Sequence, residues 1–173
     1  MNVPIVDSSL ARNGYADWYR NLDSGMIRIQ SATFVSLLIS QEAIRNVGLP
    51  IGSFFIWGDD TEYTMRLTRY YGQAYMVGRS KILHYRIGAK ALDICTETNT
   101  TRISNYKYHV RNNLIVARYY QGRMSVFKYF MKKIILCIKV LTERGDIRLK
   151  VSRFNSIMQG CISYLLHRYC LGD

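Results

Sequence analysis

Helical periodicity in the C-terminal part of the chain is the feature that most restricts its fold. Between residues 125 and 141, apolar side chains recur every three or four positions, which is the spacing of one face of an α-helix. The stretches 105–120 and 147–169 are also typical of helices. The sequence therefore predicts an α-helical region over 96–173, entered through a polar linker at 96–104 that contains four threonines.

The part before it, residues 1–95, predicts a different architecture. Its expected elements, in chain order, are a buried strand over 32–39, a helix capped by Ser40 and ended by Gly48, a helix over 60–71, and two short strands over 73–77 and 80–85. Strands and helices in this order favour part of an α/β sheet. We therefore expect an α/β region followed by an α-helical C-terminal region.

Positive charge is concentrated in the helical region. The formal net charge of the chain is +12, of which residues 1–95 carry +2 and residues 96–173 carry +10. Basic surfaces attract anionic lipid, nucleic acid or phosphorylated ligands. The basic residues are interleaved with large aliphatic side chains and no nucleic-acid-binding motif is visible, so an anionic membrane surface is favoured over nucleic acid.

The helix expected over 125–141 has two interpretations. Lys128, Lys132 and Lys139 share a face beside the apolar stripe. They would be solvated if the stripe packs on a core, or would contact lipid headgroups if the helix lies in a membrane interface. No stretch reaches the length of about 18 apolar residues that a membrane-spanning helix needs.

Cysteine usage and the N-terminus bear on compartment. Cys95, Cys137, Cys161 and Cys170 include no pair with Cys-x-x-Cys spacing. They are interpreted as buried thiols in a reducing compartment. The first 25 residues lack the apolar core of a signal peptide, and a cytoplasmic location is expected.

An apolar run meets a cluster of acids at residues 54–63, FFIWGDDTEY. Asp59, Asp60 and Glu62 lie at the start of an expected helix, where a carboxylate can serve simply as a cap. Three carboxylates within four residues repel one another unless something compensates them. Arg66 can neutralise Asp59 and Glu62 at helical spacing. Asp60 would then be the carboxylate that a substrate hydroxyl reaches, as a general base requires.

His84 is the second candidate. It ends the run KILHY, about two dozen residues after the acids. It is either a partly buried histidine bonded to backbone or, together with carboxylates, a ligand for a divalent metal.

Several of these segments together resemble a known family. The run SGMIRI at 24–29, the segment 33–67 that contains GDDTEYTMRL, and YGQAYMVGRSKILHY at 71–85 resemble the second half of the catalytic domain of family 2 inverting glycosyltransferases. The group that they most resemble is the bacterial galactofuranosyl- and rhamnosyltransferases. YKYHVRN at 106–112 and the glycines at 160 and 172 extend the likeness.

The resemblance implies the C-terminal half of a GT-A, Rossmann-like domain, over 1–95. It implies transfer of a sugar from a UDP- or dTDP-linked donor to a hydroxyl of a glycan or polyprenyl-linked acceptor, with Asp60 as the base. Trp57, Asp59 and Glu62 would shape the acceptor site. His84 would help to hold Mn²⁺ or Mg²⁺ on the donor diphosphate.

The chain departs from the family in one respect, because it contains no Asp-x-Asp metal motif. It therefore resembles a C-terminal piece: a truncated product, half of a split enzyme, or a domain of a longer protein. We expect the chain alone to be inactive, and to need an N-terminal partner half or to self-associate. The expected location is the inner face of the cell membrane. The alternatives are a non-catalytic basic module that binds membrane or a partner protein, and a remnant that has lost catalysis.

Overall fold

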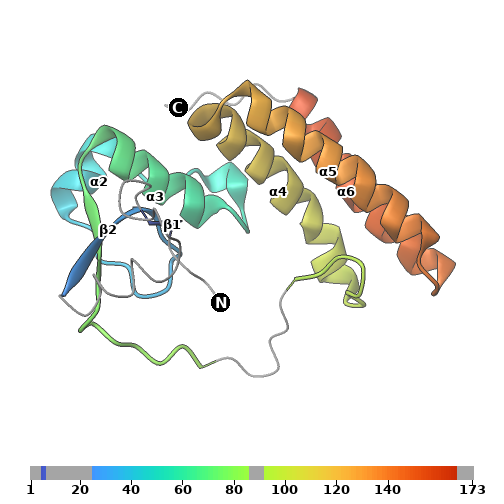
Figure 1. The fold of residues 1–173 in the computed structure, drawn as a ribbon, viewed down its shortest axis with the longest axis horizontal. Helices are drawn as coiled ribbons and strands as arrows, with labels where there is room; N and C mark the ends of the chain where they lie inside the picture. The colour runs from blue at the N-terminus through green and yellow to red at the C-terminus, as the bar shows by residue number, and fades with distance from the viewer. Residues whose placement is uncertain (1–4, 7–24, 86–91, 167–173) are drawn as a thin grey trace. The chain divides into compact units, whose positions relative to one another are not determined.

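The computed structural model describes residues 5–6, 25–85 and 92–166 (Figure 1). It is mixed α/β and mostly helical. The chain divides into two compact units, the first made of residues 1–52 and 59–88 and the second of residues 53–58 and 89–173. The short segment 53–58 thus belongs with the C-terminal helices, which the sequence did not indicate.

The first unit contains a small antiparallel sheet in the order β1-β2-β3. Its strands are β1 (Ile5–Val6), β2 (Met26–Ser31) and β3 (Ala74–Val77). In β2 the side chains alternate, with Ile27 and Ile29 buried and Arg28 exposed between them, as a strand with one covered face requires. β3 confirms the strand that the sequence predicted at 73–77.

The strand predicted over 32–39 is wrong. The strand in this part of the chain is β2, and residues 32–40 that follow it form no regular element. Residues 26–31 of β2 are less hydrophobic than residues 32–39 that follow them. The sequence therefore predicts a strand at 32–39 instead of at β2. The strand predicted over 80–85 is wrong as well, since this segment pairs with no described strand and Leu83 is 89% exposed.

Two helices complete the first unit, and both follow their local signals. α2 (Gln41–Val47) begins at Ser40, whose hydroxyl accepts from the Ala43 amide at 3.1 Å, and it ends at Gly48 with φ of 80°. α3 (Asp59–Tyr70) packs beside it around Tyr63 and Leu67. The helix predicted over 60–71 is therefore confirmed within one residue at each end.

The second unit is helical. It consists of a 3₁₀ turn, η1 (Gly52–Phe54), which begins at the last residue of the first unit, then α4 (Thr100–Val116), continued by the π-helical turn η2 (Ala117–Gln121), and then α5 (Arg123–Thr142) and α6 (Ile147–Leu166). The three predicted helices are confirmed as far as they are described. The predicted linker is shorter than expected, because Asn99 caps α4 already at Thr100 and accepts from the Arg102 amide at 3.1 Å.

α4 and α6 approach each other closely at Gly160. A Cβ atom on this glycine would lie 2.6 Å from the Lys107 carbonyl oxygen and 2.6 Å from the Val110 Cβ. Real Cβ atoms do not come so close, so the crossing needs a glycine here. Around it lies an apolar core whose fully buried members include Val110, Leu114 and Ile157.

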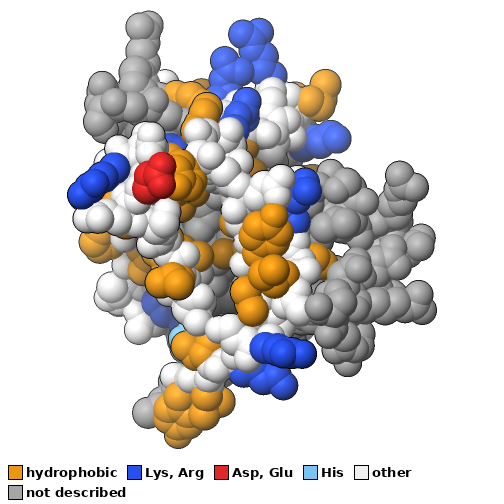
Figure 2. Space-filling view, turned by 90° about the vertical axis from the view of Figure 1, so that its left-hand side faces the viewer, with side chains coloured by type: hydrophobic (Ala, Val, Ile, Leu, Met, Phe, Trp, Pro, Cys, Tyr) orange, Lys and Arg blue, Asp and Glu red, His pale blue; other side chains and the backbone are white. Residues whose placement is uncertain are grey.

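Basic side chains occupy more of the face drawn in Figure 2 than acidic ones do, and hydrophobic side chains are spread among them. This agrees with the net charge of +12. Among the described residues, no helix combines the length and hydropathy needed to cross a bilayer.

Candidate functional site

The acidic cluster lies in the first turn of α3, as the sequence predicted. Asp59, Asp60 and Glu62 are all within it. The Thr61 amide donates to Asp60 Oδ1 at 2.7 Å, and the Thr61 hydroxyl lies 3.3 Å from the same oxygen. The Asp60 carboxylate is therefore fixed at the N-terminus of the helix, where it is half-buried rather than extended into solvent.

Burial sets the protonation behaviour of Asp60. Loss of solvent raises the pKa of its carboxyl above the ordinary value, and the neighbouring Asp59 charge raises it further, while hydrogen bonds from Thr61 and from the Phe34 backbone oppose the increase. A carboxylate with a raised pKa is a stronger proton acceptor than an ordinary one. The environment of Asp60 is therefore that of a group suited to take a proton.

Glu62 has a different environment. Its side chain is fully buried, and its two oxygens accept from Arg66 Nε at 2.9 Å and Arg66 Nη2 at 3.1 Å. Arg66 also donates to the carbonyl oxygens of Val47 at 2.7 Å and Leu49 at 3.0 Å. The predicted pairing of Arg66 with Glu62 is confirmed, whereas no bond between Arg66 and Asp59 is found among the described residues. The Arg66 bonds to Val47 and Leu49 join α3 to the end of α2. In this geometry Glu62 supports the helix, and its side chain is not exposed at the surface.

The loop before the acids has an unusual backbone. Phe55 and Trp57 have φ of 60° and 59°, in the left-handed region that large side chains seldom occupy. Gly58 follows with φ of 101°, and a Cβ there would lie 3.1 Å from the Asn112 Cβ. Strained backbone of this kind persists only where the surroundings hold it.

Asn112 on α4 holds this loop. Its side chain is fully buried, and Nδ2 lies 2.9 Å from the carbonyl oxygen of Phe54, 3.2 Å from that of Ile56 and 2.9 Å from that of Trp57. Its Oδ1 accepts from Arg111 Nε at 3.0 Å, and Arg111 Nη2 donates to the Ser53 carbonyl. One amide and one guanidinium thus bind four carbonyls of the loop 53–57.

Aromatic side chains of the loop pack against α4. The Phe55 and Tyr108 rings are 5.1 Å apart, and the Trp57 and His109 rings meet edge-on at 6.4 Å. Burial lowers the pKa of His109 to about 4, with a smaller contribution from the Lys133 charge. His109 is therefore neutral at physiological pH. Phe55 is 66% exposed, so its ring is accessible to a ligand from solvent.

His84, the predicted metal ligand, belongs to no metal-binding group among the described residues. His84 is exposed, and the described residues contain no group of three or more His, Cys, Asp or Glu side chains that could hold a metal ion. The residues that the structure describes thus do not by themselves fit a Mn²⁺ or Mg²⁺ site. Cys95, Cys137 and Cys161 are buried free thiols, as predicted, and burial raises the pKa of each; Cys170 lies outside the described residues.

Comparisons with known proteins add no assignment. No protein-family model matches the chain, and neither the search of curated proteins nor the search of solved structures gives a significant match.

Sequence reasoning missed the loop-holding residues. In the sequence, Arg111 and Asn112 stand out only as the end of the segment 106–112, which indicates no role for them. The available signal is a run of three polar residues, 111–113, between Val110 and the apolar end of the helix, since buried polar residues must form hydrogen bonds.

Proposed function

We propose that this chain supplies the acceptor side and the general base of an inverting sugar transfer from a nucleotide-linked donor, with a GT-A-like arrangement completed by a donor-binding part. The main support is Asp60. Its carboxylate is fixed at a helix N-terminus by Thr61, its pKa is raised by burial, and it follows a strained loop with exposed aromatic surface.

Each group has a defined task in this reaction. Asp60 accepts the proton of the acceptor hydroxyl as that oxygen attacks the anomeric carbon of the donor. Trp57 and Asp59 contribute to the acceptor site, since sugars present apolar ring faces to aromatic side chains and hydroxyls to carboxylates. Arg66 and Glu62 keep α3 in place. The donor-binding part would come from another polypeptide or another segment, because the chain contains no Asp-x-Asp motif.

The test is complementation of sugar transfer. Extract from source cells that lack this chain is supplied with a labelled UDP- or dTDP-hexose and with purified wild-type chain or a variant. We expect wild type to restore transfer to glycan or lipid-linked acceptors, and Asp60→Asn to reduce it by about 10²- to 10⁴-fold. Glu42→Gln, an exposed acid in α2, is the matched control and should transfer normally. Equal activity of Asp60→Asn and Glu42→Gln would refute the role of Asp60.

Peripheral binding to an anionic membrane is a second candidate function, and α5 is the observation that favours it. One stripe of this helix is exposed although it is apolar, and it consists of Met124, Phe127, Met131, Ile134, Ile135, Ile138 and Leu141. Lys128, Lys132 and Lys139 are also exposed and lie along one edge of the stripe at helical spacing. α5 contains no acidic residue. An interfacial helix has this combination of features, whereas a second copy of α5 would bring like charges together.

Vesicle binding tests this candidate. We expect the chain to bind phosphatidylserine-containing vesicles at low salt and to be released as salt rises. Ile138→Gln should weaken binding about tenfold, since it removes apolar area that enters the interface. Ile82→Gln is the matched control, because Ile82 and Ile138 are both 58% exposed. Absence of binding, or equal effects of the two substitutions, would refute a membrane role for α5.

A further inference from the structure

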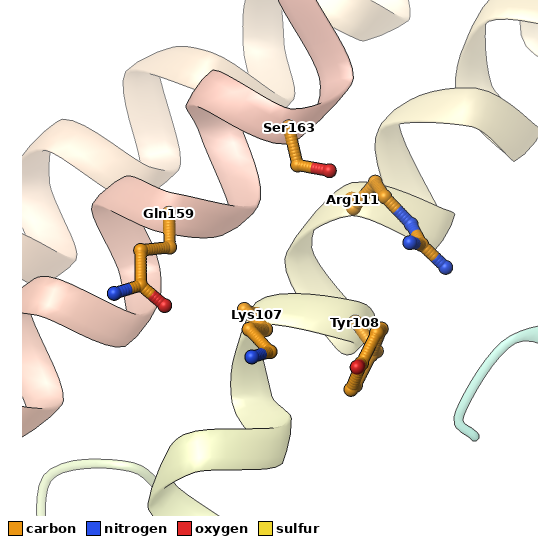
Figure 3. A pocket seen from close by; sticks show the side chains of 5 residues that line it. All are labelled: Lys107, Tyr108, Arg111, Gln159 and Ser163. Carbon is orange, nitrogen blue, oxygen red and sulfur yellow. The ribbon is translucent and has the colours of Figure 1, made fainter. Parts of the chain in front are cut away.

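A small hollow lies between α4 and α6, near the close contact of the two helices at Gly160. It measures about 290 Å³ and is lined by Lys107, Tyr108, Arg111, Gln159 and Ser163. Lys107, Tyr108 and Arg111 come from α4, and Gln159 and Ser163 come from α6 (Figure 3). Because Gly160 brings the two backbones together, polar side chains on either side of the crossing are held at a fixed separation. The hollow is thus part of the helix packing and not a gap between mobile loops.

Its charge is wholly positive. Lys107 and Arg111 lie four residues apart on one helix, so that their charges repel. Both point at the Tyr108 ring, with Lys107 Nζ 5.2 Å and Arg111 Cζ 5.0 Å from its centroid. Neither α4 nor α6 contains an Asp or Glu. No carboxylate of these two helices can therefore offset the repulsion between Lys107 and Arg111, whereas a bound anion in the hollow would offset it.

Donor groups in the hollow are available for a ligand. Within the part of the chain that the structure describes, no hydrogen bond joins the Lys107 ammonium, the Tyr108 hydroxyl or the Gln159 amide to another residue. Arg111 is already bound to Asn112 and to the Ser53 carbonyl, so it adds charge while Lys107 would make the direct contact. An ammonium, a hydroxyl and an amide together match the several acceptor oxygens of a phosphate.

We propose that the α4–α6 hollow binds a phosphate group through Lys107, Tyr108 and Gln159. A volume of about 290 Å³ lies at the lower end of the range for ligand pockets, so the site takes the phosphate end of a molecule rather than a whole nucleotide. The phosphate belongs either to a soluble phosphate compound or to a lipid headgroup. The proposal does not rest on the sugar transfer proposed above, although Tyr108 and Arg111 also contact the loop 53–57.

The first experiment is a titration of the isotope-labelled full chain with inorganic phosphate, with chloride at equal ionic strength as reference. We expect saturable shifts of the backbone amide signals of residues 107–111 and 159–163. Lys107→Gln should weaken binding at least about tenfold, as loss of a charge-assisted hydrogen bond does. Gln159→Glu places a carboxylate at an exposed position of the hollow and should abolish binding without affecting the fold.

The matched control is Arg148→Gln, which removes one exposed positive charge from α6 about 16 Å along the helix from Gln159. Vesicles with phosphatidic acid, compared with neutral vesicles, form the second arm. If Lys107→Gln lowers only the binding of inorganic phosphate, the hollow binds the phosphate of a soluble compound. If it lowers only the binding of vesicles, the hollow binds a lipid headgroup. Either result supports the site. Equal responses of Lys107→Gln, Gln159→Glu and Arg148→Gln, or shifts that do not saturate in either arm, would overturn it.

Discussion

The two units differ in how they hold the segments that contain the candidate site residues, α3 in the first unit and the loop 53–58 in the second. In the first unit, α3 is held largely by polar bonds, above all those of Arg66, beside a small apolar cluster of Ala43, Tyr63 and Leu67. In the second unit, α4–α6 enclose an apolar core of ten buried residues, and the loop 53–58 is attached to it through Asn112. The first unit should therefore be sensitive to the loss of one charge, and the second to changes in packing.

Arg66→Ala should have the largest effect and should separate the two units. It removes the arginine that pairs with the buried Glu62 carboxylate, and it removes the bonds to Val47 and Leu49. Removal of one partner of a buried pair costs about 3–5 kcal/mol. Hydrogen exchange should show loss of protection in α2 and α3 while α4–α6 stay protected. Arg45→Ala, which replaces an exposed arginine of α2, is the control. If Arg66→Ala reduces hydrogen-exchange protection equally in both units, the first unit is not the one that depends on this charge.

Asn112→Ala should have the next largest effect, and it acts in the second unit. It removes the donor from the Phe54 and Trp57 carbonyls, and each buried acceptor left unsatisfied costs about 1–3 kcal/mol. We expect a loss of about 3 kcal/mol in urea unfolding and faster exchange of the amides of 54–58. Asn105 lies on the same helix, and its side chain forms no hydrogen bond with another described residue, so Asn105→Ala should be nearly neutral. Intact protection of the loop in Asn112→Ala would contradict the assignment.

Gly160→Ala tests packing without any change of charge. Its methyl group would overlap the Lys107 carbonyl and Val110. Overpacking of this kind costs about 1–3 kcal/mol, reduced by up to about 1 kcal/mol because alanine favours a helix. Thermal unfolding should show the loss in the second unit. Gly52→Ala is the control, since a Cβ there meets nothing within 4 Å. An unchanged melting temperature of Gly160→Ala would mean that α4 and α6 can separate freely.

Most of the helices could be predicted from the sequence, and the sheet only in part. Ser40 and Gly48 mark the ends of α2, and the apolar periodicity of 125–141 marks α5. These signals are local, so the helices can be predicted without knowledge of distant residues. β2 could not be located in this way. Its alternation depends on which face is covered, and the more apolar run that follows it forms a loop fastened by Thr64, whose hydroxyl accepts from the Ala32 amide at 3.0 Å.

The site shows the same division between local and distant contacts. The Glu62–Arg66 pair is four residues apart and was predicted correctly. Asn112 contacts the loop across 55 to 58 residues, and no spacing rule connects positions so far apart. The strained backbone of Phe55 and Trp57 was equally invisible in the sequence, because their side chains are typical of a buried extended segment. Distant hydrogen bonds, rather than local propensity, give this loop its shape.

Acid should weaken the second unit through His109. Its pKa of about 4 lies below the value of about 6.5 in an unfolded chain. The unfolded state therefore binds the proton first, and stability that is complete above pH 6.5 is lost as the pH falls toward 4. Urea unfolding of the second unit between pH 7 and 4 should show this decline, and His109→Gln should flatten it. His84→Gln, at an exposed position, should leave the decline unchanged; a decline that persists in His109→Gln would place its origin elsewhere.

The first unit should respond to acid in the opposite direction through Asp60, although with the smallest effect. Because burial raises the pKa of this carboxyl in the folded state, the folded state binds the proton first as the pH falls. The contribution of Asp60 to stability is therefore greatest at low pH and is lost as the pH rises through its folded pKa. Asp60→Asn should stabilise α3 at neutral pH, as measured by hydrogen exchange of its amides, and should do so less at pH 4. If Asp60→Asn is more stable than wild type but no longer supports sugar transfer, the charged, half-buried carboxylate lowers the stability of the fold. A trade of stability for activity is expected of a catalytic base and not of a helix cap. If Asp60→Asn instead destabilises α3 at neutral pH, the carboxylate acts as a cap.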